Sequence, residues 1–157
     1  MGYRGIRWFR SPGTIIIFPD SEYCWMTSVL FVCTYNSVRS QLAEGVCRRL
    51  HPNWDIASAG IGKAALSPHV VRVLEEEGVD CFSMYAKLLC ELPVRTYDVL
   101  VVLCENAWQA RTAFPPAAEV IYHPVRSPDL WIGEDELSDY RRLREELKEW
   151  MIQELHF

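Results

Sequence analysis

A cysteine and an arginine lie at the two ends of the short segment CTYNSVR, Cys33 to Arg39. The apolar stretch VLFV precedes the cysteine, and a helical pattern follows the arginine. A loop that turns sharply from a strand into a helix points several backbone N–H groups at one place and so forms an anion site. Arg39 adds a planar, permanently charged group that can hold two oxygens of a tetrahedral oxyanion. The expected oxyanion-binding residues are Thr34, Tyr35, Asn36, Ser37, Val38, Arg39 and Ser40.

Cys33 is the expected nucleophile of this loop. Helix N-termini and nearby cations lower a cysteine pKa from about 8.5 to roughly 3.5–7.5, which favours the thiolate. We expect Ser37 or Ser40 to donate a further hydrogen bond to the sulfur, and Asn36 to take a left-handed backbone position. The alternative is a buried strand-end cysteine and a solvated arginine, because a C-x5-R spacing also arises by chance. The strand before and the helix after favour the functional interpretation.

Four apolar segments are predicted to be the strands of a parallel sheet. They span residues 28–33, 54–60, 96–104 and 118–124. Helical patterns separate or follow them at 39–50, 67–78, 83–92, 105–114 and 134–155. Alternation of this kind implies right-handed crossovers. We therefore predict an α/β fold, a single three-layer sandwich with about four parallel strands and helices on both faces.

The ends of two predicted strands carry thiols. Cys33 closes the first strand, and Cys104 closes the third. In open parallel sheets the ligand site lies beyond the carboxyl ends of the strands. We therefore expect both sulfurs at the same edge of the sheet. The alternative for Cys104 is an ordinary buried thiol, since free cysteine is commonly buried.

The composition indicates one globular domain. The chain has 157 residues, of which 50% are hydrophobic and 24% are charged. Its formal net charge is −5, and no basic stripe is available for phosphate contacts, so no nucleic-acid partner is expected. The six cysteines form no CxxC pair, and the four histidines are scattered, so neither a metal site nor a cofactor is expected.

The first 25 residues differ from the rest of the chain. They are rich in aromatic residues, glycine and proline and have no helical period. Their apolar patch at 15–18 is shorter than the roughly 7–15 residues of a signal-peptide core, and no stretch reaches the roughly 20 apolar residues that cross a bilayer. We interpret residues 1–25 as an N-terminal extension and residues 26–157 as the domain, in a cytoplasmic protein without membrane association.

The segment VLFVCTYNSVRSQLAEG resembles the phosphate-binding loop of the low-molecular-weight protein tyrosine phosphatases and of the arsenate reductases that share their fold. The resemblance extends over about residues 28–151 and includes SAG at 58–60, EEEGVD at 75–80 and YDVLVVLCENA at 97–107. It is closest to the arsenate reductase branch. The fold that it implies agrees with the one inferred from the strand and helix patterns.

The resemblance implies a role for each matching residue. Cys33 would be the nucleophile, Arg39 the oxyanion clamp, Asn36 the loop-shaping residue and Ser40 the stabiliser of the thiolate. Asp129 would be the general acid that protonates a leaving oxygen. The family usually has proline directly after that aspartate, whereas here Pro128 precedes it and Leu130 follows. The alternative for Asp129 is a capping or solvated loop carboxylate.

Two features favour the reductase over the phosphatase. The loop continues RSQ at 39–41, as in arsenate reductases, and VVLCENA resembles the reductase segment in which Cys104 would be the second redox cysteine. One feature opposes it. The third cysteine of thioredoxin-linked reductases would lie seven residues later, where this chain has Arg111. Cys81, Cys90 or a small thiol would then have to take its place.

The sequence therefore predicts an arsenate reductase with a cysteine nucleophile, whose adduct is resolved by a second cysteine or a small thiol. The substrate would be an oxyanion, arsenate or phosphotyrosine, and the reductant thioredoxin, glutaredoxin or glutathione. A low-molecular-weight protein tyrosine phosphatase acting through phosphocysteine is the alternative enzyme. A phosphate-binding or redox-sensing module without turnover is the non-enzymatic alternative.

Overall fold

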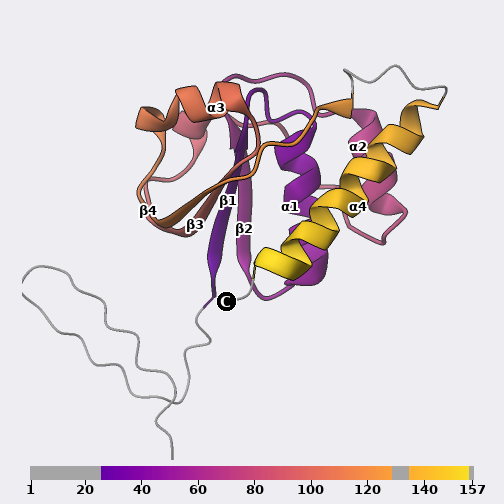
Figure 1. Ribbon diagram of the computed structural model, residues 1–157, viewed down its shortest axis with the longest axis horizontal. Helices are drawn as coiled ribbons and strands as arrows, with labels where there is room; N and C mark the ends of the chain where they lie inside the picture. Colours follow the sequence, from indigo (N-terminus) through magenta and orange to yellow (C-terminus); the bar gives the residue numbers. More distant parts are fainter. Residues whose placement is uncertain (1–25, 129–134, 156–157) are drawn as a thin grey trace, which may run out of the picture.

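One open sheet of four parallel strands organises the protein (Figure 1). The computed structural model describes residues 26–128 and 135–155, and the predicted extension at 1–25 lies outside them. The strands are β1 (Ser28–Cys33), β2 (Asp55–Gly60), β3 (Tyr97–Val102) and β4 (Ala117–Tyr122). Their order in the sheet is β2-β1-β3-β4, and every neighbouring pair is parallel. The predicted α/β fold is confirmed.

The burial of each strand follows from its place in the sheet. β1 lies between β2 and β3, and all six of its residues are buried, which explains its continuous apolar sequence. β4 is an edge strand, and none of its residues is fully buried. The core is therefore centred on β1 and β3, and the loop that follows β1 starts from the most deeply buried strand.

Four α-helices complete the fold. They are α1 (Arg39–Leu50), α2 (Pro68–Glu75), α3 (Glu105–Gln109) and α4 (Glu136–Glu154). Figure 1 shows α1, α2 and α4 together on one side of the sheet, with α3 apart from them toward the other side. The side of α1 that packs on the sheet buries Leu42, Ala43, Val46 and Cys47, and Leu50 at its end is partly buried.

Local signals mark the ends of two helices. Ser67 is the N-cap of α2 and Pro68 its first residue, positions at which serine and proline are favoured. Gly78, which follows α2, has a φ of 76°, a conformation that side chains other than glycine adopt poorly. The side chain of Asp135 caps α4 by accepting a hydrogen bond from the backbone N–H of Leu137 at 3.1 Å.

The predicted helix at 83–92 is largely wrong. Only Leu89–Glu91 is helical, as a single 3₁₀ turn. The residues before it are held by β2, because the N–H of Gly60 donates to the carbonyl of Lys87 at 2.8 Å and Gly60 also pairs with Leu88. This pairing with a distant strand overrides the local helical pattern.

Other boundaries also differ from the prediction, and two of them bear on the site. The third strand ends at Val102, and Cys104 is the N-cap of α3. The predicted helix at 105–114 divides into α3 and a 3₁₀ turn at Arg111–Ala113. The sulfur of Cys104 therefore lies at the junction between a strand and a helix, as the sulfur of Cys33 does.

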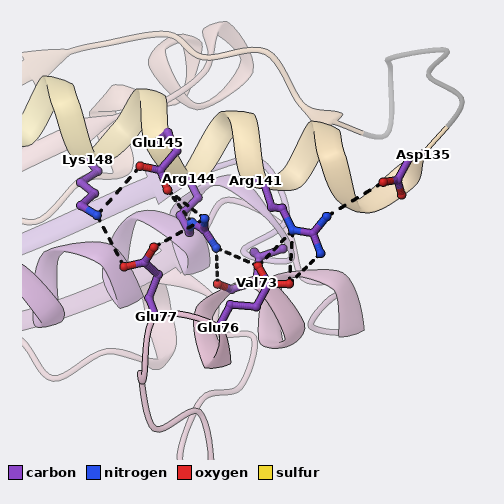
Figure 2. Close-up of polar contacts among 8 residues, drawn as sticks. All are labelled: Val73, Glu76, Glu77, Asp135, Arg141, Arg144, Glu145 and Lys148. Carbon is purple, nitrogen blue, oxygen red and sulfur yellow. Dashed lines mark hydrogen bonds and ion pairs between the residues drawn. The ribbon is translucent and has the colours of Figure 1, made fainter.

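An ion-pair network joins α4 to the end of α2 (Figure 2). Arg141 and Arg144 contact the carboxylate of Glu76 at 2.8 and 3.0 Å. Lys148 approaches Glu77 at 3.5 Å. The hydrogen bond from Arg141 is the main reason that the pKa of Glu76 falls from 4.5 to about 2. The network holds the C-terminal helix in a fixed register against α2.

The described residues also bear on membrane and metal binding. Within 26–128 and 135–155, no helix is long and apolar enough to span a bilayer. The same residues contain no cluster of three or more His, Cys, Asp or Glu side chains suited to a metal ion. The five cysteines that the structure describes, Cys33, Cys47, Cys81, Cys90 and Cys104, are free thiols.

Candidate active site

The loop between β1 and α1 forms the floor of a cleft of about 310 Å³. Cys33 ends β1 and is only 2% exposed. Arg39 begins α1. The structure therefore brings these two residues to one cavity. The described residues that line it are Cys33, Thr34, Tyr35, Ser37, Val38, Arg39, Ala64, Asn106 and Ser127.

Asn36 shapes the loop from below. Its φ of 50° places it in the left-handed region, as the sequence predicts. Its side-chain amide donates to the hydroxyls of Ser40 and Ser58 at 2.8 and 2.9 Å. Its carbonyl oxygen accepts from the side chain of Gln41 and the backbone N–H of Lys87 at 2.9 and 2.8 Å. The side chain is fully buried, so these bonds fix the conformation of the loop.

The hydroxyl of Ser40 lies 2.8 Å from the sulfur of Cys33. The same oxygen already accepts a hydrogen bond from the amide of Asn36. When Cys33 is a thiolate it carries no hydrogen, so the hydroxyl of Ser40 must then be the donor to the sulfur. A charged sulfur accepts such a bond more strongly than a neutral one. Ser37 donates instead to the carbonyl of Ala65 at 2.7 Å. Of the two serines predicted to contact the sulfur, Ser40 is therefore the one that is hydrogen-bonded to Cys33.

A buried carboxylate extends the hydrogen-bond network of Asn36 and Ser40 away from the cleft. The hydroxyl of Ser58 donates to Glu44, which is 2% exposed and forms an ion pair with Arg48. Lys87 lies 3.9 Å from the same carboxylate. Burial lowers the pKa of Lys87, and the charge of Glu44 partly opposes that effect. A continuous chain of polar contacts thus runs from Cys33 to a buried carboxylate flanked by two basic groups.

Sequence reasoning missed these supporting residues. No role was predicted for Ser58, although it lies in SAG, or for Lys87, and each reaches the loop only through tertiary structure. The sequence position of Glu44 offered one clue to its supporting role. It lies four residues after Ser40 on the same face of α1, where a carboxylate can be buried only with partners.

The segment after β2 packs against the backbone of the loop. The N–H groups of Ile61, Gly62 and Ala64 donate to the carbonyls of residues 33, 34 and 35 at 3.2, 2.7 and 3.1 Å. A Cβ atom at Gly60 would lie 2.8 Å from the nitrogen of Asn36. This close approach explains the glycine in SAG, because a side chain there would push the loop away.

Cys104 contacts the first residue of the loop. Its sulfur lies 3.2 Å from the hydroxyl of Thr34, and the residue is 5% exposed. The backbone supports this position, since the N–H of Leu103 donates to the carbonyl of Val32 at 2.9 Å. The expected placement of Cys33 and Cys104 at one edge of the sheet is therefore observed.

The other described thiols lie elsewhere. Cys47 is fully buried in α1, and burial, aided by the charge of Glu44, raises its pKa to about 12. Burial also raises the pKa of Cys81, and its sulfur is placed 3.6 Å from the carbonyl of Val79. Cys90 is exposed on the 3₁₀ turn. Among the described cysteines, only Cys33 lines the cleft.

Asp129, the predicted general acid, lies outside the described residues. Two contacts show where the chain reaches the cleft just before it. Arg39 donates to the carbonyl of Val125 at 3.5 Å, and Ser127 lines the cleft. The position of the aspartate therefore stays a prediction.

Known proteins provide an independent comparison. The sequence profile described as low molecular weight phosphotyrosine protein phosphatase matches residues 28–130. An arsenate reductase of Halalkalibacterium halodurans is 32% identical over 122 residues, which cover 76% of this chain and 88% of that protein. Both named activities are enzymatic, in agreement with the prediction of an enzyme.

Solved structures with the same fold represent both activities. An arsenate reductase in the phosphate binding state has a TM-score of 0.65 at 26% identity, covering 82% of this chain and 95% of that chain. A low molecular weight protein tyrosine phosphatase from T. tengcongensis has a TM-score of 0.69 at 25% identity, covering 82% and 97%. The profile match extends over most of the chain and includes the whole loop. The chain belongs to the low molecular weight phosphotyrosine protein phosphatase family.

Proposed function

We propose that the protein reduces arsenate, with Cys33 as the nucleophile and Cys104 as the thiol that resolves the adduct. The observation that carries this proposal is the contact between Cys104 and Thr34 at 3.2 Å. It puts a second thiol beside the residue that follows the nucleophile. A phosphatase would have no chemical use for a thiol there, whereas a reductase needs one.

In the first step, the thiolate of Cys33 attacks the arsenic atom of arsenate. A sulfur–arsenic bond forms, and one arsenate oxygen leaves as water after protonation. Arg39 and the N–H groups of the loop hold the remaining oxygens and their charge. Ser40 donates to the sulfur before the attack.

In the second step, the thiolate of Cys104 attacks the sulfur of Cys33. The sulfur–arsenic bond breaks, and its electron pair stays on arsenic, which leaves as arsenite. Cys33 and Cys104 are then joined by a disulfide, so that two thiols have supplied the two electrons. The attack requires the sulfurs to approach bonding distance, about 2.05 Å in a disulfide, and both start next to Thr34.

The decisive assay measures arsenite release by the purified protein with arsenate and a thiol reductant. Cys33→Ser should abolish it, and Cys104→Ser should stop it after formation of the adduct. Phosphate should compete with arsenate, since the loop recognises charge and tetrahedral shape. Release of arsenite by Cys104→Ser at the wild-type rate would contradict the proposed second step.

Phosphatase activity is the second candidate, and one observation favours it. The phosphatase from T. tengcongensis matches the fold as well as the arsenate reductase does, with TM-scores of 0.69 and 0.65. In that chemistry Asp129 would protonate the leaving phenol, and water would hydrolyse the phosphocysteine. Brisk hydrolysis of p-nitrophenyl phosphate that survives Cys104→Ser but not Asp129→Asn would establish it. Phosphate binding without either turnover would point to a sensor module.

A further inference from the structure

We propose that a small anionic monothiol reduces the Cys33–Cys104 disulfide by entering the cleft and attacking the sulfur of Cys33. This inference rests on the proposed arsenate reduction and names its electron donor. It follows from the burial of the two sulfurs, the way α3 is held, and the charge of the cleft.

Both sulfurs are recessed. Cys33 and Cys104 are 2% and 5% exposed, and only Cys33 lines the cleft. A thiol that exchanges with the disulfide must bring its sulfur to about 2.05 Å from the sulfur it attacks. A small thiol can reach Cys33 through the cleft, whereas the cysteine of a folded protein must bring its neighbouring residues into the same space.

Side-chain contacts hold α3 in place, and Cys104 is held with it because it is the N-cap of that helix. Tyr122 donates to the carboxylate of Glu105 at 2.6 Å and stacks on Trp108 with ring centroids 5.1 Å apart. The guanidinium of Arg111 lies over the ring of Trp108, 5.0 Å from its centre. The disulfide would therefore stay at the floor of the cleft instead of moving to the surface.

No second described thiol is placed to carry the electrons outward. Cys47 is fully buried with a pKa of about 12, and neither Cys81 nor Cys90 belongs to the described lining of the cleft. The donor must therefore act on Cys33 directly.

Arg39 gives the described part of the cleft a positive charge, which favours an anion. Arg39 is the only charged side chain among its described lining residues. None of the ion pairs among the described residues involves Arg39, and its hydrogen bond is to the carbonyl of Val125. Once arsenite has left, this cation favours a donor that carries a carboxylate. Neutral groups form the rim, where Tyr35 is 58% exposed beside Ala64 and Asn106.

The exchange is balanced with two donor molecules. The first thiolate bonds to the sulfur of Cys33, the disulfide breaks, and Cys104 leaves with the electron pair and takes a proton. The second thiolate attacks the donor sulfur of the mixed disulfide and releases Cys33 as a thiolate. Two monothiols thus become one small disulfide and restore the two electrons that arsenate consumed.

The test starts from protein oxidised in a single turnover with arsenate. Recovery of free thiols is followed with 3-mercaptopropionate, cysteamine and 2-mercaptoethanol, which are similar in size but anionic, cationic and neutral. Each rate is divided by the rate of the same thiol with neutral hydroxyethyl disulfide, which removes differences in intrinsic reactivity. We expect the anionic thiol to be about tenfold favoured over the cationic one, with a smaller ratio in 1 M salt. Equal or reversed ratios would overturn the proposal.

Three variants sharpen the assignment. Asn106→Asp places a carboxylate in the cleft wall and should abolish the preference for the anionic thiol, whereas Thr112→Asp adds the same charge at an exposed position off the cleft and should preserve it. A variant with Cys24, Cys81 and Cys90 replaced by serine should be reduced by glutathione as fast as the wild type. Loss of that reduction, or reduction by thioredoxin but not by glutathione, would refute direct attack by a small thiol.

The outcome separates this inference from the proposed function. If a single turnover yields neither arsenite nor the Cys33–Cys104 disulfide, the proposed function fails. If both appear but small anionic thiols do not restore the thiols, only the identity of the donor is wrong.

Discussion

Replacing Gly60 with alanine should displace the oxyanion loop. The new Cβ would lie 2.8 Å from the nitrogen of Asn36 and 2.9 Å from the carbonyl carbon of Tyr35, and closer still to the carbonyl oxygen of Gly62. All three atoms belong to the backbone, so no side-chain rotation relieves the overlap. Carbon atoms rest about 3.5–4.0 Å apart, so the backbone must move by roughly 1 Å.

The expected loss of activity follows from that displacement. A misplacement of about 1 Å can cost about 10²-fold in rate, and the loop holds both Cys33 and Arg39. Overpacking of this kind also destabilises a fold by about 1–3 kcal/mol. We expect kcat/KM for arsenate reduction, or for p-nitrophenyl phosphate hydrolysis, to fall about 100-fold, with a parallel loss of phosphate affinity. Urea denaturation measures the loss of stability.

Gly78→Ala provides the matched control. A Cβ at Gly78 meets no atom within 4 Å, but its φ of 76° is unfavourable for alanine. This substitution should cost about 1–2 kcal/mol of stability and leave kcat/KM unchanged. If Gly60→Ala keeps kcat/KM within twofold of the wild type, the proposed fit between β2 and the loop is wrong.

Three further predictions concern single side chains. Ser40→Ala should slow the alkylation of Cys33 by iodoacetamide about tenfold, because hydrogen bonds to charged groups contribute roughly 1.5–3 kcal/mol; an unchanged rate would contradict the bond direction assigned to Ser40. Glu76 should stabilise the fold fully above pH 4.5 and progressively less as the pH falls toward 2, because its pKa is 4.5 unfolded and about 2 folded. Glu76→Gln should therefore unfold at lower urea than the wild type at pH 7, with the gap narrowing below pH 4.5 and closing only near pH 2. Cys47, with a pKa of about 12, should resist alkylation at pH 8 until urea unfolds the protein, and mass spectrometry of the alkylated peptides would detect any earlier reaction.

The sequence alone determined the elements whose signals are local. The apolar run at 28–33 indicated the strand β1, and the helical pattern at 67–78 indicated α2, which begins after Ser67. The oxyanion loop could also be recognised from the sequence, because its cysteine, its arginine and the loop-shaping Asn36 lie within seven consecutive residues. Periodicity, caps and turn residues act over a few positions, so one stretch of chain carries the whole signal.

Only the tertiary structure decided what surrounds that loop. The segment before Leu89 is extended because Gly60 pairs with it, against its own helical pattern. Glu44 supports Asn36 through Ser58, and Cys104 meets Thr34 although 70 positions separate them. Contacts between residues far apart in the chain depend on how the strands pair and the helices pack, and no local pattern specifies their geometry.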